Sequence, residues 1–188
     1  MSDDVFAANL AEWGDFYVLT GTAAATLLGL VFIALSLRPG VMADHGPIGL
    51  RAFAGQTFGN LLIVLVIALI CLIPHQSSET LGVTLLLISL FDLMRAAHRF
   101  RTVQDDPDPV WRSRTGLMRF VLPATAHFFM LLVAVDMLFG DGDALAWLIT
   151  SIFILVADAA GGAWHLLTEM GRRHDETESS SALVSDRQ

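Results

Sequence analysis

The chain has 188 residues, of which 54% are hydrophobic, and its mean hydropathy is +0.61. Its single cysteine, Cys71, excludes an intramolecular disulfide. The formal net charge of -8 comes from acids spread along the chain, so it identifies no basic partner, and we expect no nucleic-acid partner. The composition fits either one soluble domain or one small helical bundle in lipid, so segment length decides between them.

Five apolar segments predict membrane-spanning helices, because about 20 residues at about 1.5 Å each cross the roughly 30 Å hydrocarbon core. In chain order they cover residues 16–37, 52–73, 78–95, 118–139 and 144–167. The third is short and contains Asp92, so it spans only if the helix extends toward Ser77 and Arg95 snorkels. The leader before the first segment is acidic, which favours a retained span over a cleaved signal peptide.

The sequence therefore predicts an all-α integral membrane bundle of five transmembrane helices. We expect residues 1–170 to form one transmembrane domain. Residues 171–188 are polar, acidic and serine-rich, which predicts a disordered cytoplasmic tail.

The basic residues are distributed unevenly along the chain. All 11 are arginines, and they lie in or beside alternate gaps between the apolar segments. Cytoplasmic loops carry such an excess, so the pattern predicts the N-terminus outside and the C-terminus inside. Arginine without lysine also resembles proteins of high-GC bacteria, and we expect a bacterial inner membrane.

Small residues recur at four-residue spacing on three segments, which lets helices approach one another closely. They are Gly21, Ala25 and Gly29 on the first segment, Gly55 and Gly59 on the second, and Ala157 and Gly161 on the fifth. Two explanations account for these stripes equally well: packing of helices within one chain, and an interface between copies of the chain. A homo-oligomer is thus one of two expectations.

Ionisable side chains in hydrocarbon cost about 2.5–3.5 kcal/mol each on insertion scales, so each needs a reason. The fourth and fifth segments run in opposite directions, which places His127 and Asp158 at one depth, just inward of the bilayer centre. Asn60 and Ser89 reach nearly the same depth, and Gln56 lies one turn inward of Asn60. The sequence therefore predicts a polar layer.

Within this layer, His127 and Asp158 can share a hydrogen bond if their helices turn these faces together. Such a pair passes a proton, lines a cation path or binds a metal, or it simply satisfies two buried polar groups. His165 shares the helix face of Asp158 nearer the cytoplasm, whereas Asp136 faces away from His127 near the outer mouth.

A separate ion pair is expected at the inner interface. Arg95 and Arg99 follow Asp92 by three and seven residues, so the three side chains stack on one side of a helix.

The sequence carries no signature of an enzyme. It has no phosphate-binding glycine loop, no His-Glu-x-x-His helix, no Gly-x-Ser-x-Gly elbow and no paired-cysteine metal site. His127 and His165 differ in depth by more than one turn, which argues against haem held between them. We expect no catalysis, no cofactor and no structural metal.

The first span also carries a resemblance. Trp13 and the aromatics after it precede a span of the form G-x-A-A-A-x-x-x-G-L-x-F-x-A-x-S, which begins at Gly21. This opening resembles a group of small bacterial membrane proteins, some of which carry the automatic label modulator of FtsH protease. The resemblance covers the first fifth of the chain and transfers no catalytic residue.

These observations lead to two functional expectations. The first is a small channel or permeation protein for an inorganic ion or proton, with the polar layer as its path. The alternative is a non-catalytic membrane adaptor that modulates a membrane protease or another complex through its small-residue faces.

The predicted topology is tested by reporter fusions at the two ends of the chain. We expect an alkaline phosphatase fusion to be active at the N-terminus and a green fluorescent protein fusion to be bright at the C-terminus. Fusions that place both ends in one compartment would contradict five spans.

Overall fold

The computed structural model describes residues 3–37, 48–104, 114–139, 146–164 and 168, and every regular element among them is helical. The helices are α1 (Asp3–Glu12), α2 (Gly14–Ser36), α4 (Ile48–Cys71), α5 (Ser78–Gln104) and α6 (Arg114–Phe139), followed by a fifth spanning helix, Ala146–Trp164. Five of these helices are long and apolar enough to cross a membrane, which confirms the predicted helical membrane bundle. The predicted tail, residues 171–188, lies outside the described residues.

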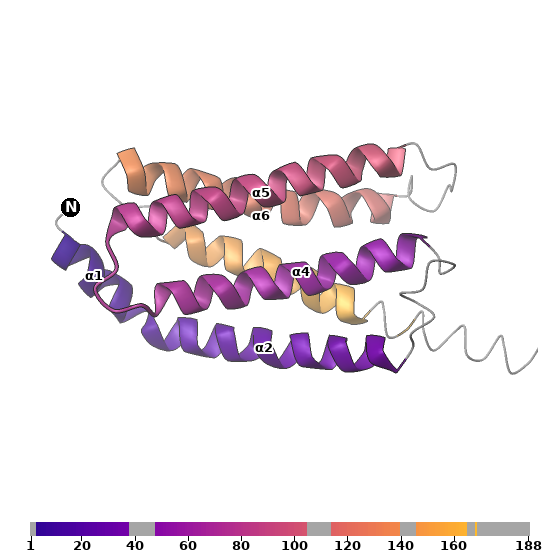
Figure 1. The fold of residues 1–188 in the computed structure, drawn as a ribbon, viewed down its shortest axis with the longest axis horizontal. Helices are drawn as coiled ribbons and strands as arrows, with labels where there is room; N and C mark the ends of the chain where they lie inside the picture. The colour runs from indigo at the N-terminus through magenta and orange to yellow at the C-terminus, as the bar shows by residue number, and fades with distance from the viewer. Residues whose placement is uncertain (1–2, 38–47, 105–113, 140–145, 165–167, 169–188) are drawn as a thin grey trace, which may run out of the picture.

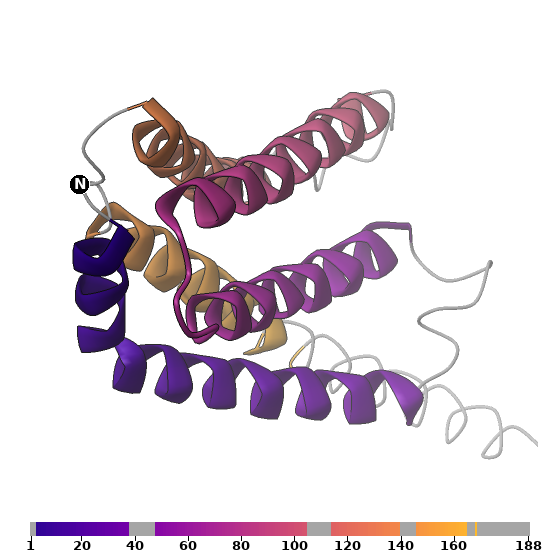
Figure 2. The same cartoon turned by 60° about the vertical axis from the view of Figure 1, so that its left-hand side comes forward.

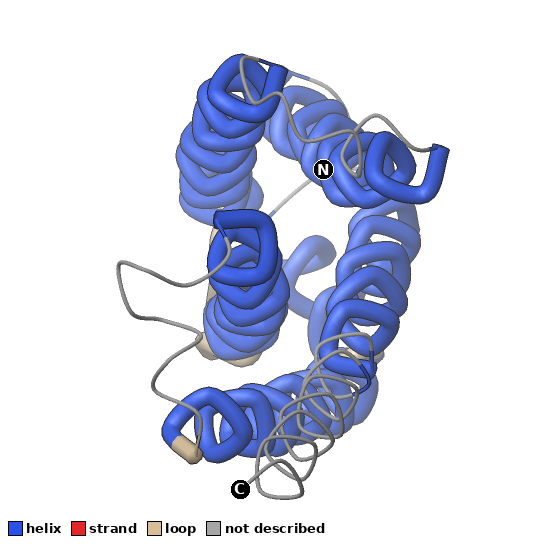
Figure 3. The backbone as a smooth tube through the Cα atoms, turned by 90° about the vertical axis from the view of Figure 1, so that its right-hand side faces the viewer, coloured by secondary structure: helices blue, strands red, loops and turns tan. Residues whose placement is uncertain are grey.

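The spanning helices lie side by side, and each runs antiparallel to the one before it (Figure 1). Among α2, α4, α5 and α6, the closest pairings are α2 with α4 and α5 with α6, whereas α4 and α5 touch only lightly. The fifth spanning helix contacts α2 through Phe16 and Phe153 and α6 through Phe129 and Trp147. Figure 3 views this arrangement from the end opposite α1. The bundle is thus two helix pairs joined by the fifth span.

The turn between α4 and α5 is fixed by short polar contacts. Ser77 caps α5, because its Oγ accepts a hydrogen bond from the backbone N–H of Thr80 at 3.2 Å. Ser78 Oγ donates to the Met137 carbonyl at 3.0 Å and so ties the start of α5 to the end of α6. His75 adopts φ 57°, a left-handed conformation in which histidine is enriched among non-glycine residues. These contacts therefore fix the start of α5 against the end of α6.

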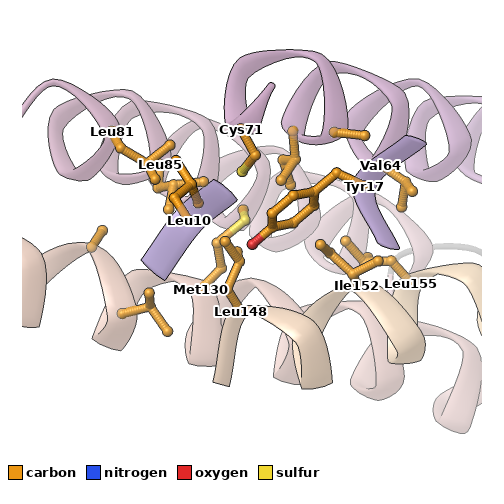
Figure 4. Packing of buried hydrophobic residues seen from close by; sticks show 14 of the residues in the cluster. Leu10, Tyr17, Val64, Cys71, Leu81, Leu85, Met130, Leu148, Ile152 and Leu155 are labelled. Carbon is orange, nitrogen blue, oxygen red and sulfur yellow. The ribbon is translucent and has the colours of Figure 1, made fainter. Parts of the chain in front are cut away.

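Helix α1 is an element that the sequence analysis treated only as an acidic leader. It turns away from the direction of α2 and lies at the end of the bundle where α4 meets α5 (Figure 2). Phe6 is completely buried and Leu10 is 3% exposed, both within the main apolar core. Figure 4 shows Leu10 beside Leu81 and Leu85 of α5. Helix α1 therefore closes one end of the apolar core.

That core occupies the half of the bundle nearer α1. Tyr17, Val64, Leu85, Met130 and Ile152 represent the helices that meet there, and each is at most 1% exposed. Tyr17 points into this cluster from α2 (Figure 4).

The outer surface of the spans is apolar as well. Leu19, Phe32, Leu87 and Phe153 are all at least 60% exposed. A surface of this kind is unfavourable in water but needs no partner beyond lipid in a bilayer, where the hydrocarbon is as apolar as leucine. The exposed side chains thus agree with contact between the spans and the bilayer.

The small residues of the predicted stripes have different surroundings. Gly21 is buried, and a Cβ there would lie 3.1 Å from Ala68 Cβ, so α2 and α4 do approach closely at this point. Gly29, Gly55 and Gly161 have no atom within 4 Å of such a Cβ, and Ala25 is exposed. Among the described residues these four positions therefore line open helix faces.

Gly59 has a different neighbour, because a Cβ there would lie 2.5 Å from Nη2 of Arg95. Its missing side chain makes room for a guanidinium group and not for another helix backbone.

The tightest glycine contact involves Gly162, which the sequence analysis did not assign to helix packing. A Cβ at Gly162 would overlap the hydroxyl of Thr57 on α4 and lie 3.3 Å from its Cβ. Because threonine is branched at Cβ, its side chain has little freedom to move away.

Gly162→Ala is therefore expected to destabilise the protein by about 1–3 kcal/mol through overpacking. The neighbouring change, Gly161→Ala, is the matched control and is expected to stay within about 0.5 kcal/mol of the natural protein. Thermal unfolding in detergent measures both. Equal effects of the two substitutions would contradict the described packing of the fifth spanning helix against α4.

Candidate functional site

Polar side chains gather between α4, α5 and α6 in the half of the bundle away from α1. Gln56, Asn60, Asp92 and His127 are each no more than 6% exposed. Every one of them lies nearer the end of its span that is opposite α1. They occupy the place where α4 and α5 touch only lightly, and there they replace apolar packing between the two helix pairs. We call the group Gln56, Asn60, Asp92, Arg95, His127 and Asp158 the polar cluster.

Asp92 of α5 is at the centre of the cluster and faces two basic groups. Arg95 Nε lies 3.5 Å from Asp92 Oδ1, and His127 Nε2 lies 3.7 Å from Asp92 Oδ2. Both distances exceed those of a direct hydrogen bond, so we describe the contacts as ion pairs. The Asp92 and His127 side chains are 6% and 5% exposed, whereas that of Arg95 is 39% exposed.

The spacing of Asp92 and Arg95 predicted an ion pair at the inner interface. The structure gives their contact and places the Asp92 carboxylate inside the bundle, against a histidine from another helix. The side chain of Arg99, the third member of the predicted ion pair, lies outside the described residues. The Asp92–His127 contact is thus a pairing that sequence reasoning missed.

Asn60 and Asp158 join α4 to the fifth spanning helix. Asn60 Nδ2 donates a hydrogen bond to Asp158 Oδ2 at 2.8 Å. Because the acceptor is a carboxylate, this bond belongs to the stronger, charge-assisted kind. The two residues were predicted to share a depth, and the structure brings them together. The hydrogen bond expected between His127 and Asp158 stays a prediction.

The orientation of His127 is fixed by its own helix. Its Nδ1 lies 2.7 Å from the carbonyl oxygen of Pro123, one turn earlier in α6. A carbonyl only accepts hydrogen bonds, so Nδ1 is the donor and carries a hydrogen. The other ring nitrogen, Nε2, is therefore the one that faces Asp92.

A small cavity lies within the cluster. Its volume is about 10 Å³, which is close to the space that one water molecule needs. The lining residues are Gln56, Asn60, Asp92, Ala96, Pro123, Ala124 and His127. Their polar atoms give a water molecule several hydrogen-bond partners, which is the other requirement for a hydrated cavity.

Ser89 and Asp136, two predicted site residues that the structure describes, do not line this cavity. Ser89 is fully buried but donates to the Leu85 carbonyl of its own helix at 2.7 Å. Asp136 is half-buried near the end of α6 at which α1 lies. His165 lies outside the described residues. In the part of the chain that the structure describes, no three His, Cys, Asp or Glu side chains are placed to hold a metal ion.

Comparisons with protein-family models, with curated proteins and with solved structures give no match.

A double-mutant cycle tests the contact between α4 and the fifth spanning helix. We expect Asn60→Ala and Asp158→Ala to couple by about 0.6–1.7 kcal/mol, the span from average to largest measured for hydrogen bonds between membrane helices. Unfolding in detergent gives the four stabilities. The control cycle pairs Asn60→Ala with Thr22→Ala. The described hydrogen bond of Thr22 stays within α2, where its hydroxyl donates to the Val18 carbonyl, so no coupling is expected. A purely additive Asn60 and Asp158 pair would contradict the structure.

Proposed function

We propose that the chain is a small channel or permeation protein of a bacterial inner membrane, that it moves protons or small inorganic ions, and that the polar cluster is its ion-handling site. The observation that carries this proposal is the burial of Asp92 and His127, at 5% and 4% exposed, beside a water-sized cavity in hydrocarbon. Ionisable groups are costly there and mark ion or proton pathways in membrane proteins. No enzymatic step is part of this proposal.

The size of the cavity favours a proton or a stripped ion over a hydrated one. It has room for about one water molecule. On the side toward α1, the completely buried side chains of Leu85, Met130 and Leu155 follow it within one apolar core. A hydrated ion needs a wider passage than this arrangement offers, whereas a proton moves between neighbouring polar groups over short distances.

The open helix faces support a homo-oligomer as the working form. Gly29, Gly55 and Gly161 leave space beside α2, α4 and the fifth spanning helix. Small residues on such faces let another membrane helix approach closely. We propose that copies of this chain meet along these faces.

The same faces favour one second candidate, a non-catalytic adaptor that holds a different membrane protein there. The adaptor needs the faces but not the buried ionisable groups. Substitutions in the polar cluster therefore separate the two functions.

Proton flux into liposomes containing the purified protein and a trapped pH-sensitive dye tests the proposal. We expect His127→Ala and Asp158→Ala each to reduce potential-driven flux by about tenfold or more, which corresponds to about 1.4 kcal/mol in the barrier. Replacement of the proton gradient by sodium or potassium gradients, read with ion-selective dyes, identifies the permeant ion.

The controls remove the same residue types outside the cluster. His98 and Asp15 are exposed, so His98→Ala and Asp15→Ala are expected to keep the natural flux. Unchanged flux of every ion tested in His127→Ala and Asp158→Ala, with the protein folded, would refute the permeation function and leave the adaptor.

A further inference from the structure

The polar cluster contains a histidine whose two ring nitrogens are not equivalent. His127 is 4% exposed, and its Nδ1 hydrogen is committed to the Pro123 carbonyl at 2.7 Å. A neutral imidazole carries one N–H, so the neutral form of His127 has its hydrogen on Nδ1 and a lone pair on Nε2. The side of the ring that accepts a proton is therefore the side facing Asp92 and the cavity.

The surroundings of Nε2 suit a positive charge. From α5, the Asp92 carboxylate lies 3.7 Å away on one side, while its other oxygen faces Arg95. From α4, the amides of Gln56 and Asn60 line the cavity and carry no charge. From the fifth spanning helix, Asp158 adds a second carboxylate, held by Asn60. With Nε2 protonated, two acids and two bases balance within the cluster.

We propose that Asp92 and His127 form a proton-binding site in which Nε2 alone gains and loses a proton, while Nδ1 keeps its hydrogen throughout. In the uptake step a hydronium ion gives a proton to the Nε2 lone pair, a new N–H bond forms, one O–H bond breaks, and a water molecule remains. The cavity holds that water beside Asp92. This inference rests on the proposed function, since it names the ion that the cluster takes up.

The role of Asp92 is to stabilise the protonated ring by its negative charge and proximity. Asp92 is itself oriented by Arg95, whose guanidinium lies against Gly59 of α4. Since the Arg95 side chain is 39% exposed, it extends from the buried site toward the surface. Arg95 thus marks the side from which a proton reaches the cavity.

Solid-state nitrogen NMR of the full chain in lipid vesicles tests the site directly. The protein is labelled with ¹⁵N histidine, and His127→Gln identifies the signals of His127 among the six histidines. Over the range from about pH 8 to about pH 5, in which histidine ordinarily titrates, we expect Nδ1 to stay protonated and Nε2 to change from bare to protonated.

Asp92→Asn keeps the shape of the side chain and removes its charge. At a pH at which His127 of the natural protein is protonated on Nε2, we expect His127 of the Asp92→Asn variant to remain neutral, with its hydrogen on Nδ1. The exposed residue His98 gives the internal control, because it lies on the surface of α5 and outside the polar cluster.

Two results would overturn the proton site. One is a neutral His127 with its hydrogen on Nε2, and the other is an Nε2 that does not change state with pH. Both are read from the natural protein, so they decide the question even if Asp92→Asn fails to fold. Flux that is unaffected by His127→Ala, together with an Nε2 that titrates, would refute permeation and retain the proton site.

Discussion

The absence of water from the hydrocarbon core is the constraint on which this structure depends. A backbone amide or carbonyl has no partner there except one that the chain supplies, so each span forms a helix and bonds its own main chain. Hydroxyl groups follow the same rule. Thr22 and Thr26 each bond a carbonyl one turn earlier in α2, at 2.8 Å, and so stay in lipid-facing positions. The polar cluster is the larger instance, because Asn60 and Asp158 satisfy each other between two helices at 2.8 Å.

The helical spans were largely predictable from the sequence because the length of an apolar segment is a one-dimensional property. The third span shows the limits of this reasoning. Residues 78–95 were predicted, whereas the helix continues as Ser78–Gln104, since apolar length marks the edge of the membrane and not the end of the helix. Helix α1 was missed because its buried residues, Phe6 and Leu10, are too few to stand out from an acidic segment.

The depth of the site residues along their spans was predictable from the sequence, but the side chains that they contact were not. Counting residues along each span brought Asn60 and Asp158 to one level, and they do form a hydrogen bond. The partner of His127 was missed, because the rotation of each helix about its axis decides which neighbours meet, and small side-chain contacts set that rotation. Asp92 was read as an interface residue from its spacing to Arg95. A second basic neighbour on a different helix, His127, leaves no trace in that spacing.

The unequal division of the bundle has an electrical consequence. A potential across a membrane falls mainly through its low-dielectric part and is worth about 2.3 kcal/mol per elementary charge for each 100 mV. The apolar core capped by α1 makes up that part on one side of the polar cluster. A proton bound at His127, as proposed above, would experience most of the voltage drop on the α1 side, so we expect its binding to depend on the sign of the membrane voltage.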